Sequence, residues 1–270
     1  MKELKNILKQ YKKIEFTPSI EDERAEMYQY VYATNKLEGN QLTLSQTTQL
    51  LKSDTISGEH IKTSDVLEQK GMYKALSRML KAVREKEKLS VKLLLELNWL
   101  TLSYLWKYDD AYINAKSKGQ KEGEFKISKN KIQITKADKV IKEIIPLSEP
   151  NNANKNMQHL VETINNSNKN VLEKAVFIAQ EIWLHQPFVD GNKRTGRLLI
   201  NFLTMQEGFP LFSFNLENSN YNSLLVEQYI DGKKDLVLNY ITAQLIEKMQ
   251  TEIHKNKKTK KDNNGFRMLL

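Results

Sequence analysis

Residues 184–197 read Leu-His-Gln-Pro-Phe-Val-Asp-Gly-Asn-Lys-Arg-Thr-Gly-Arg. Apolar residues recur at three- and four-residue steps before and after this stretch, which predicts two buried helices joined by a short polar loop. Pro187 and Gly191 are expected to end the first helix, and Asp190 and Asn192 are residue types that cap a second. The fold is therefore expected to be organised around these two helices and their loop.

The start of the second helix has the character of an anion site. Free backbone N–H groups and the positive end of the helix dipole would point at whatever lies above the loop. Arg194 and Arg197 are three residues apart, so both lie on one face of the first turns. This combination suits a polyphosphate.

The composition favours one mainly helical domain with appendages. The 270 residues are 40% hydrophobic and contain only 10 Gly and 5 Pro, which allows a substantial core and favours helices. Between residues 21 and 51 we expect a helix, a loop at Gly39-Asn40, and a second helix in which Thr43 and Gln46 form a capping box. Helical spacing predicts further helices over 64–87, 88–106, 157–164, 221–229 and 236–249.

Charge and cysteine content limit the class of protein. Cysteine is absent, which excludes disulfides and cysteine-ligated metals. No apolar run reaches the roughly 18 residues that span a bilayer, and no signal-like segment follows Met1, so we expect a cytoplasmic protein without membrane contact. The net charge is +9, with lysines crowded at both ends. The terminal lysines favour a solvated tail over a nucleic-acid arm, because no helix-turn-helix or interleaved aromatic pattern accompanies them.

The loop resembles the signature of the Fic family, His-x-Phe-x-Asp/Glu-Gly-Asn-x-Arg-x-x-Arg. Matching residues stand at six signature positions: Phe188, Asp190, Gly191, Asn192, Arg194 and Arg197. The signature histidine position holds Gln186, and His185 stands one residue early. Lys193 is a second departure, because many adenylylating members carry glycine there while the related Doc toxins carry lysine.

A second stretch resembles the N-terminal inhibitory motif of Fic proteins, Ser/Thr-x-x-x-Glu-Gly/Asn. Residues 34–40 read Thr-Asn-Lys-Leu-Glu-Gly-Asn. The resemblance implies that Glu38 pairs with Arg197 and blocks the γ-phosphate position. The electrostatics agree, because an arginine committed to a carboxylate is unavailable to phosphate and a nearby carboxylate repels a nucleotide. The alternative is a helix-end carboxylate without such a role.

Residues 124–135 alternate apolar and polar side chains about an Asn130-Lys131 turn, which predicts a short β-hairpin. In a helical protein the strand edges have few partners, so an extended peptide of a protein substrate could add to them by β-augmentation. The stretch resembles the Fic flap, which holds a target segment over the active site. The flap residues would be Lys126, Ile127 and Ser128.

The chemistry that the resemblance implies is transfer of AMP from ATP to a Ser, Thr or Tyr hydroxyl of another protein. Asp190 would hold Mg²⁺, and Arg194 with Arg197 would clamp the β- and γ-phosphates. Gly191, Asn192 and the following N–H groups would form the anion hole, with Lys193 beside it. His185 would be the base if the helix end unwinds by about one residue, because the amide of Gln186 cannot accept a proton.

Three hypotheses remain open at this stage. The first is a self-inhibited protein adenylyltransferase with a mainly α, Fic-type helical bundle and a small hairpin flap. The second is a catalytically degenerate Fic scaffold that binds nucleotide or partner without transfer, and the third is a DNA-associated regulator that uses the basic termini. We expect an N-terminal helical extension over 1–29, the Fic domain over 30–245 and a basic tail over 246–270. A homodimer is left open.

Overall fold

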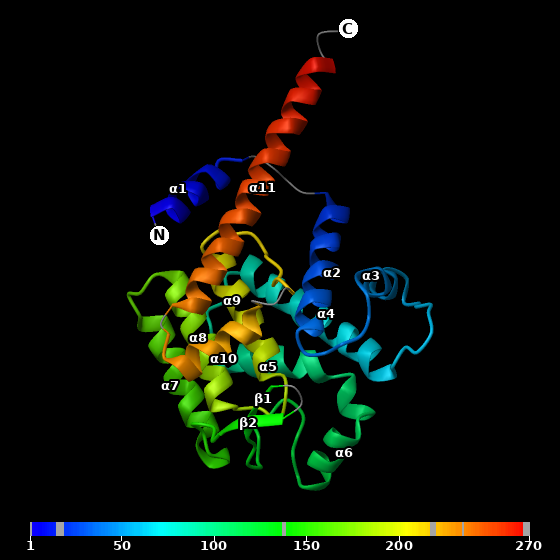
Figure 1. Ribbon diagram of the computed structural model, residues 1–270, viewed down its shortest axis with the longest axis vertical. Helices are drawn as coiled ribbons and strands as arrows, with labels where there is room; N and C mark the ends of the chain where they lie inside the picture. Colours follow the sequence, from blue (N-terminus) through cyan, green and yellow to red (C-terminus); the bar gives the residue numbers. More distant parts are fainter. Residues whose placement is uncertain (1, 15–18, 137–138, 217–219, 234, 267–270) are drawn as a thin grey trace.

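The computed structural model describes residues 2–14, 19–136, 139–216, 220–233 and 235–266. It is mainly helical with one two-stranded antiparallel hairpin, which confirms the expected fold class (Figure 1). The elements, in chain order, are α1 (Lys2–Tyr11), α2 (Ile20–Lys36), α3 (Leu44–Ser53), α4 (Thr63–Arg84), α5 (Val91–Leu102), η1 (Leu105–Lys107), α6 (Asp110–Ser117), β1 (Ile132–Lys136), β2 (Lys139–Ile144), η2 (Pro150–Asn152), α7 (Ala153–Asn166), α8 (Val171–His185), α9 (Asn192–Gln206), α10 (Tyr221–Asp231) and α11 (Leu236–Phe266).

The central pair is α8 and α9, which make the most extensive contact between any two elements described. From Arg194 to Thr204 every residue of α9 is buried, because α2, α4, α5 and α8 all pack against this helix. One apolar core joins these helices to α7, α10 and α11. The predicted pair of core helices with a polar loop between them is thus confirmed.

The helix–loop–helix expected at the N-terminal side is also confirmed, with its cap. Thr43 is the N-cap of α3: its side chain accepts a hydrogen bond from Gln46 N at 3.2 Å, and the Gln46 side chain accepts one from Thr43 N at 3.0 Å. α2 packs on α3 and α4 and touches α9. The C-terminal end of α2 therefore lies beside the first turns of α9.

The predicted hairpin is wrong in its turn. β1 pairs with β2, with Ile132 opposite Ile144, so the turn lies after Lys136 and not at Asn130-Lys131. The preceding stretch is held in a loop by Gln120, whose side chain donates to Phe125 O at 3.0 Å and accepts from Ile127 N at 2.9 Å. A side chain that ties up local backbone groups leaves them unavailable for a strand ladder.

Two further differences concern α6 and α11. The helices expected from the sequence do not include residues 110–117, where α6 lies. The helix expected over 236–249 continues to Phe266, so a helix extends into the segment that was expected to be a basic tail. Its last turns extend beyond the body of the molecule (Figure 1). α1 packs along α11 through Leu4 and Ile7. None of the helices in the described ranges is both long and apolar enough to span a bilayer.

Candidate active site

The loop between α8 and α9 is fixed by backbone geometry and by one asparagine. Gln186 ends α8 with φ 45°, and Gly191 precedes α9 with φ 76°. The φ of Gly191 lies in the left-handed region that favours glycine, and a Cβ atom there would also lie 2.9 Å from Asn98 Nδ2. The Asn192 side chain accepts a hydrogen bond from Phe188 N and donates one to Phe188 O, both at 3.1 Å. The first N–H groups of α9 are therefore presented by a fixed turn.

Asp190 lies in this turn and is held by three donors. Its Oδ2 accepts hydrogen bonds from Tyr112 Oη at 2.6 Å and Arg194 Nη2 at 2.8 Å, and its Oδ1 accepts one from Gly191 N at 2.5 Å. Desolvation would raise the pKa of Asp190, but the charge of Arg194 and these hydrogen bonds hold it below its ordinary value. The side chain is an anion and is half exposed.

This carboxylate suits a magnesium ion that arrives with a nucleotide. Mg²⁺ is commonly bound by one or two carboxylates, with waters and substrate phosphates completing its shell. Within the described ranges, no three acidic or histidine side chains are grouped closely enough to bind a metal by themselves. Asp190, anionic and half exposed beside the start of α9, fits the role of a single protein ligand.

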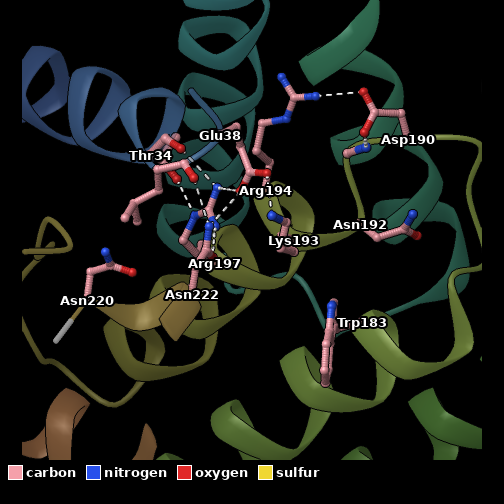
Figure 2. A network of polar contacts seen from close by, with 12 residues as sticks. Thr34, Glu38, Trp183, Asp190, Asn192, Lys193, Arg194, Arg197, Asn220 and Asn222 are labelled. Atoms are coloured by element: carbon pink, nitrogen blue, oxygen red, sulfur yellow. Dashed lines mark hydrogen bonds and ion pairs between the residues drawn. The ribbon is translucent and has the colours of Figure 1, made fainter. Parts of the chain in front are cut away.

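Arg197 is fully buried and is held by residues from α2 and α10 (Figure 2). Its Nε donates to Thr34 Oγ1 at 2.6 Å, and its Nη2 donates to Thr34 O at 2.9 Å and to Glu38 Oε1 at 2.7 Å. Its Nη1 donates to Asn222 Oδ1 at 3.1 Å, and Asn222 Nδ2 donates to Leu37 O at 2.8 Å. The end of α2 is thereby joined to α9 and α10.

The other carboxylate oxygen of Glu38 contacts a second cation. Lys193 Nζ lies 2.8 Å from Glu38 Oε2. We call Glu38, Lys193 and Arg197 the Glu38 cluster (Figure 2). Burial would raise the pKa of Glu38, but Arg197 and Lys193 outweigh it and hold the pKa far below its ordinary value. Glu38 is therefore ionised at any pH near neutrality.

Arg194 is also paired with carboxylates. Its Nη1 lies 3.0 Å from Glu68 Oε1 on α4, and its Nη2 lies 2.8 Å from Asp190 Oδ2. Glu68 accepts a further hydrogen bond at 2.8 Å from Asn40, which follows the inhibitory-motif residues directly. The Arg194 side chain is only 4% exposed, so in this structure it faces carboxylates and not an open phosphate site.

The two residues considered for the base point to different surroundings. Gln186 donates to Trp183 O at 2.7 Å and accepts from Asn192 Nδ2 at 2.9 Å, so its side chain lies against the loop. His185 remains in α8, with Nδ1 2.6 Å from Ser148 Oγ and Nε2 3.3 Å from Glu181 Oε2. The structure therefore brings Gln186, and not the His185 ring, to the signature loop.

Comparison with known proteins shows which family the signature loop and its helices match. Residues 88–204 match the family model described as Fic/DOC family. These residues form a Fic/DOC domain. Protein adenylyltransferase fic-1 of Caenorhabditis elegans is 27% identical over 192 residues, and Protein adenylyltransferase Fic of Drosophila melanogaster is 27% identical over 189 residues. The matches cover 69% and 68% of this chain but only 33% of either relative, so the chain spans about a third of their length.

Solved structures show the same fold over nearly the whole chain. A Fic domain containing signaling protein from Bacteroides thetaiotaomicron has a TM-score of 0.76 at 23% identity, covering 94% of this chain and 98% of that one. Fic-1 of C. elegans has a TM-score of 0.70 at 21% identity, covering 94% of this chain and 70% of that one. The Fic fold thus extends beyond the matched domain to α2 and its neighbours.

The three residues predicted for the flap of the Fic domain lie outside the hairpin. Lys126 N donates to Pro187 O at 2.9 Å, so this segment runs beside the signature loop. The Lys126 side chain is buried and donates to Asn130 Oδ1 at 2.6 Å, and desolvation lowers its pKa to about 8. Ile127 and Ser128 are exposed. Lys126 supports the loop, whereas the two residues after it face solvent.

Sequence reasoning missed four residues that shape the Fic site: Tyr112, Glu68, Asn98 and Asn222. Glu68 and Asn98 are polar residues inside apolar helical patterns, which is a signal that could have marked them. Asn98 Nδ2 donates to Asp190 O at 2.9 Å. Tyr112 and Asn222 carried no such signal, because their roles depend on how α6 and α10 pack.

Proposed function

We propose that this chain is a protein adenylyltransferase whose nucleotide site is closed by Glu38. The activity is suggested by the relatives, which are named protein adenylyltransferases. The closure is suggested by a single observation, the Glu38 carboxylate lying 2.7 Å from Arg197 and 2.8 Å from Lys193 at the first turns of α9. Phosphate groups would otherwise bind there, because anions bind at helix N-termini.

The chain's own residues would bind and orient ATP once Glu38 has moved away. The N–H groups that follow Gly191 would donate to the phosphates, and Arg197 would offer the terminal phosphate the nitrogen that it now gives to Glu38. Asp190 would hold Mg²⁺, which neutralises phosphate charge in such sites. A target hydroxyl would attack the α-phosphorus, the bond to the bridging oxygen would break, and pyrophosphate would leave.

The proton of the attacking hydroxyl needs an acceptor in this scheme. A glutamine amide is not a base, so Gln186 cannot take the proton. His185 would serve only after leaving Ser148 and Glu181, which now contact both ring nitrogens. The contacts of these two residues favour a second candidate function, a Fic domain that binds nucleotide or a partner but does not transfer AMP.

One labelling experiment separates the two functions. Wild type, Glu38→Gly, and Glu38→Gly combined with His185→Ala are incubated with α-³²P-ATP and Mg²⁺ in host lysate. We expect label on a protein with Glu38→Gly, at least about tenfold above wild type, because the closed state reduces the population that can bind ATP. Loss of that label in the double mutant would assign the base to His185.

Two outcomes without label on Glu38→Gly would contradict the proposed transfer. If Glu38→Gly binds ATP but transfers no label, while Gln186→His in the same background does transfer it, the native protein is the scaffold. If Glu38→Gly neither labels nor binds ATP, closure by Glu38 is the wrong account of this site.

A further inference from the structure

In the Glu38 cluster, Lys193 and Arg197 share one carboxylate. Each oxygen of the Glu38 carboxylate contacts a different cation, Arg197 through Oε1 and Lys193 through Oε2. The two contacts are nearly equal in length, at 2.7 and 2.8 Å. Glu38 therefore cannot be displaced by breaking its contact with Arg197 alone, since the lysine holds the other oxygen.

The two cations differ in what else holds them. Arg197 also donates to Thr34 and Asn222 and is fully buried, so it keeps its place when Glu38 leaves. The Lys193 side chain is 36% exposed, and among the described residues it makes no ion pair except the one with Glu38. A lysine carries its charge on a flexible four-carbon stem. Its ammonium is therefore free to turn to a different anion once the carboxylate has gone.

We propose that Lys193 has opposite effects on nucleotide binding in the two states of the site. With Glu38 in place, Lys193 stabilises the closed state and weakens binding. With Glu38 displaced, its ammonium contacts the terminal phosphates and strengthens binding. The inference rests on the proposed function, because it assumes that phosphates enter the space beside the Glu38 cluster.

The test is a double-mutant cycle with ATP and Mg²⁺, measured by isothermal titration calorimetry. Lys193→Met removes the charge and keeps the aliphatic stem, and it is made in wild type and in Glu38→Gly. In wild type, loss of the partly exposed ion pair with Glu38 would tighten ATP binding about three- to fivefold, but loss of the phosphate contact would weaken it by a similar factor, so we expect a net change of less than about twofold. In the Glu38→Gly background only the phosphate contact is lost, so we expect Lys193→Met to weaken ATP binding about three- to fivefold.

Lys36→Met is the matched control in both backgrounds. Lys36 ends α2 close to Glu38 in the chain, and within the described ranges it makes no ion pair. The Lys36→Met substitution removes the same charge from the same region as Lys193→Met, so a general electrostatic effect would appear in both variants. We expect Lys36→Met to change ATP affinity less than twofold and with the same sign in both backgrounds.

A second measurement requires no nucleotide. Without ligand, Lys193→Met should lower the unfolding temperature of wild type but not that of Glu38→Gly, where the lysine has lost its partner and faces Arg197 as a like charge. An equal loss in both backgrounds would overturn the closed-state half of the proposal. If Glu38→Gly binds ATP and Lys193→Met does not weaken that binding, the open-state half would be overturned. If Glu38→Gly binds no ATP at all, the proposed function fails with it.

Discussion

At the scale of single residues, the ionisation of Glu38 contributes to the free energy of unfolding. Its side chain is only 15% exposed, yet two cations hold it in the charged form. A buried carboxylate with paired cations resists protonation, and removing either partner leaves a buried charge without compensation. At neutral pH the pairing of Glu38 with Arg197 and Lys193 is therefore maintained by charge, and mild acid does not release it.

We predict that part of the free energy of unfolding is lost as the pH falls below about 4.5, the ordinary pKa of a glutamate. The folded pKa of Glu38 is lowered, so below this pH the unfolded state binds more protons than the folded state, and stability falls with decreasing pH. Urea unfolding between pH 3 and 7 should show a steeper loss for wild type than for Glu38→Gln, by at least about 1 kcal/mol. Parallel curves for the two proteins would contradict this assignment.

Single residues also show where prediction from sequence succeeds. The positions of Asp190 and Arg197 follow from motif spacing, since a helix start and the turn before it fix them locally, and Glu38 stands in the turn that follows α2. The partners of Arg194 do not follow, because Glu68 stands 126 residues away and meets it only through the packing of α4 on α9. Pairing between distant helices is a property of the tertiary fold and not of the local pattern.

Among the elements, the packing of α4 on α5 depends on one glycine. A Cβ atom on Gly71 would lie 2.3 Å from Thr101 O and 3.2 Å from Leu100 O. Both are backbone atoms within α5, so neither can move aside as a flexible side chain would. Since α4 carries Glu68 and α5 carries Asn98, this close approach also sets the distance between two supports of the signature loop.

Gly71→Ala should therefore destabilise the protein by about 2–3 kcal/mol, although alanine is the better helix former. Chemical denaturation measures the change, and Lys81→Ala on the exposed side of the same helix is the control, with an expected change within about 0.5 kcal/mol. A Gly71→Ala protein as stable as wild type would mean that the two helices can separate at little energetic cost.

The elements themselves were largely predictable where the signal was periodic. α4, α8, α9 and α10 appear at the expected places because each has an apolar face that repeats at helical spacing. The hairpin was misplaced because alternation continued through residues 124–131, where the Gln120 side chain takes the backbone hydrogen bonds that a strand would need. α6 was missed because its eight residues are too few for a clear period.

At the scale of the whole molecule, α2 is attached at both of its ends. Near its start, Glu26 forms an ion pair with Lys248 on α11, which also pairs with Glu252 at 2.9 Å. At its far end, Thr34 and Glu38 hold Arg197 of the central helix. Through α2, α11 is thus connected to Arg197 in the central helix, and α1 with it.

The chain carries a net charge of +9, yet the site itself is balanced. Three cations at the start of α9, Lys193, Arg194 and Arg197, face three carboxylates. A neutral site exerts little long-range attraction on a polyanion, so ATP should approach wild type at a rate that hardly depends on ionic strength. With Glu38→Gly the site gains one positive charge, and stopped-flow measurements should show faster association that slows as salt is added. The carboxylate that follows α2 would then also determine how fast ATP can find the site.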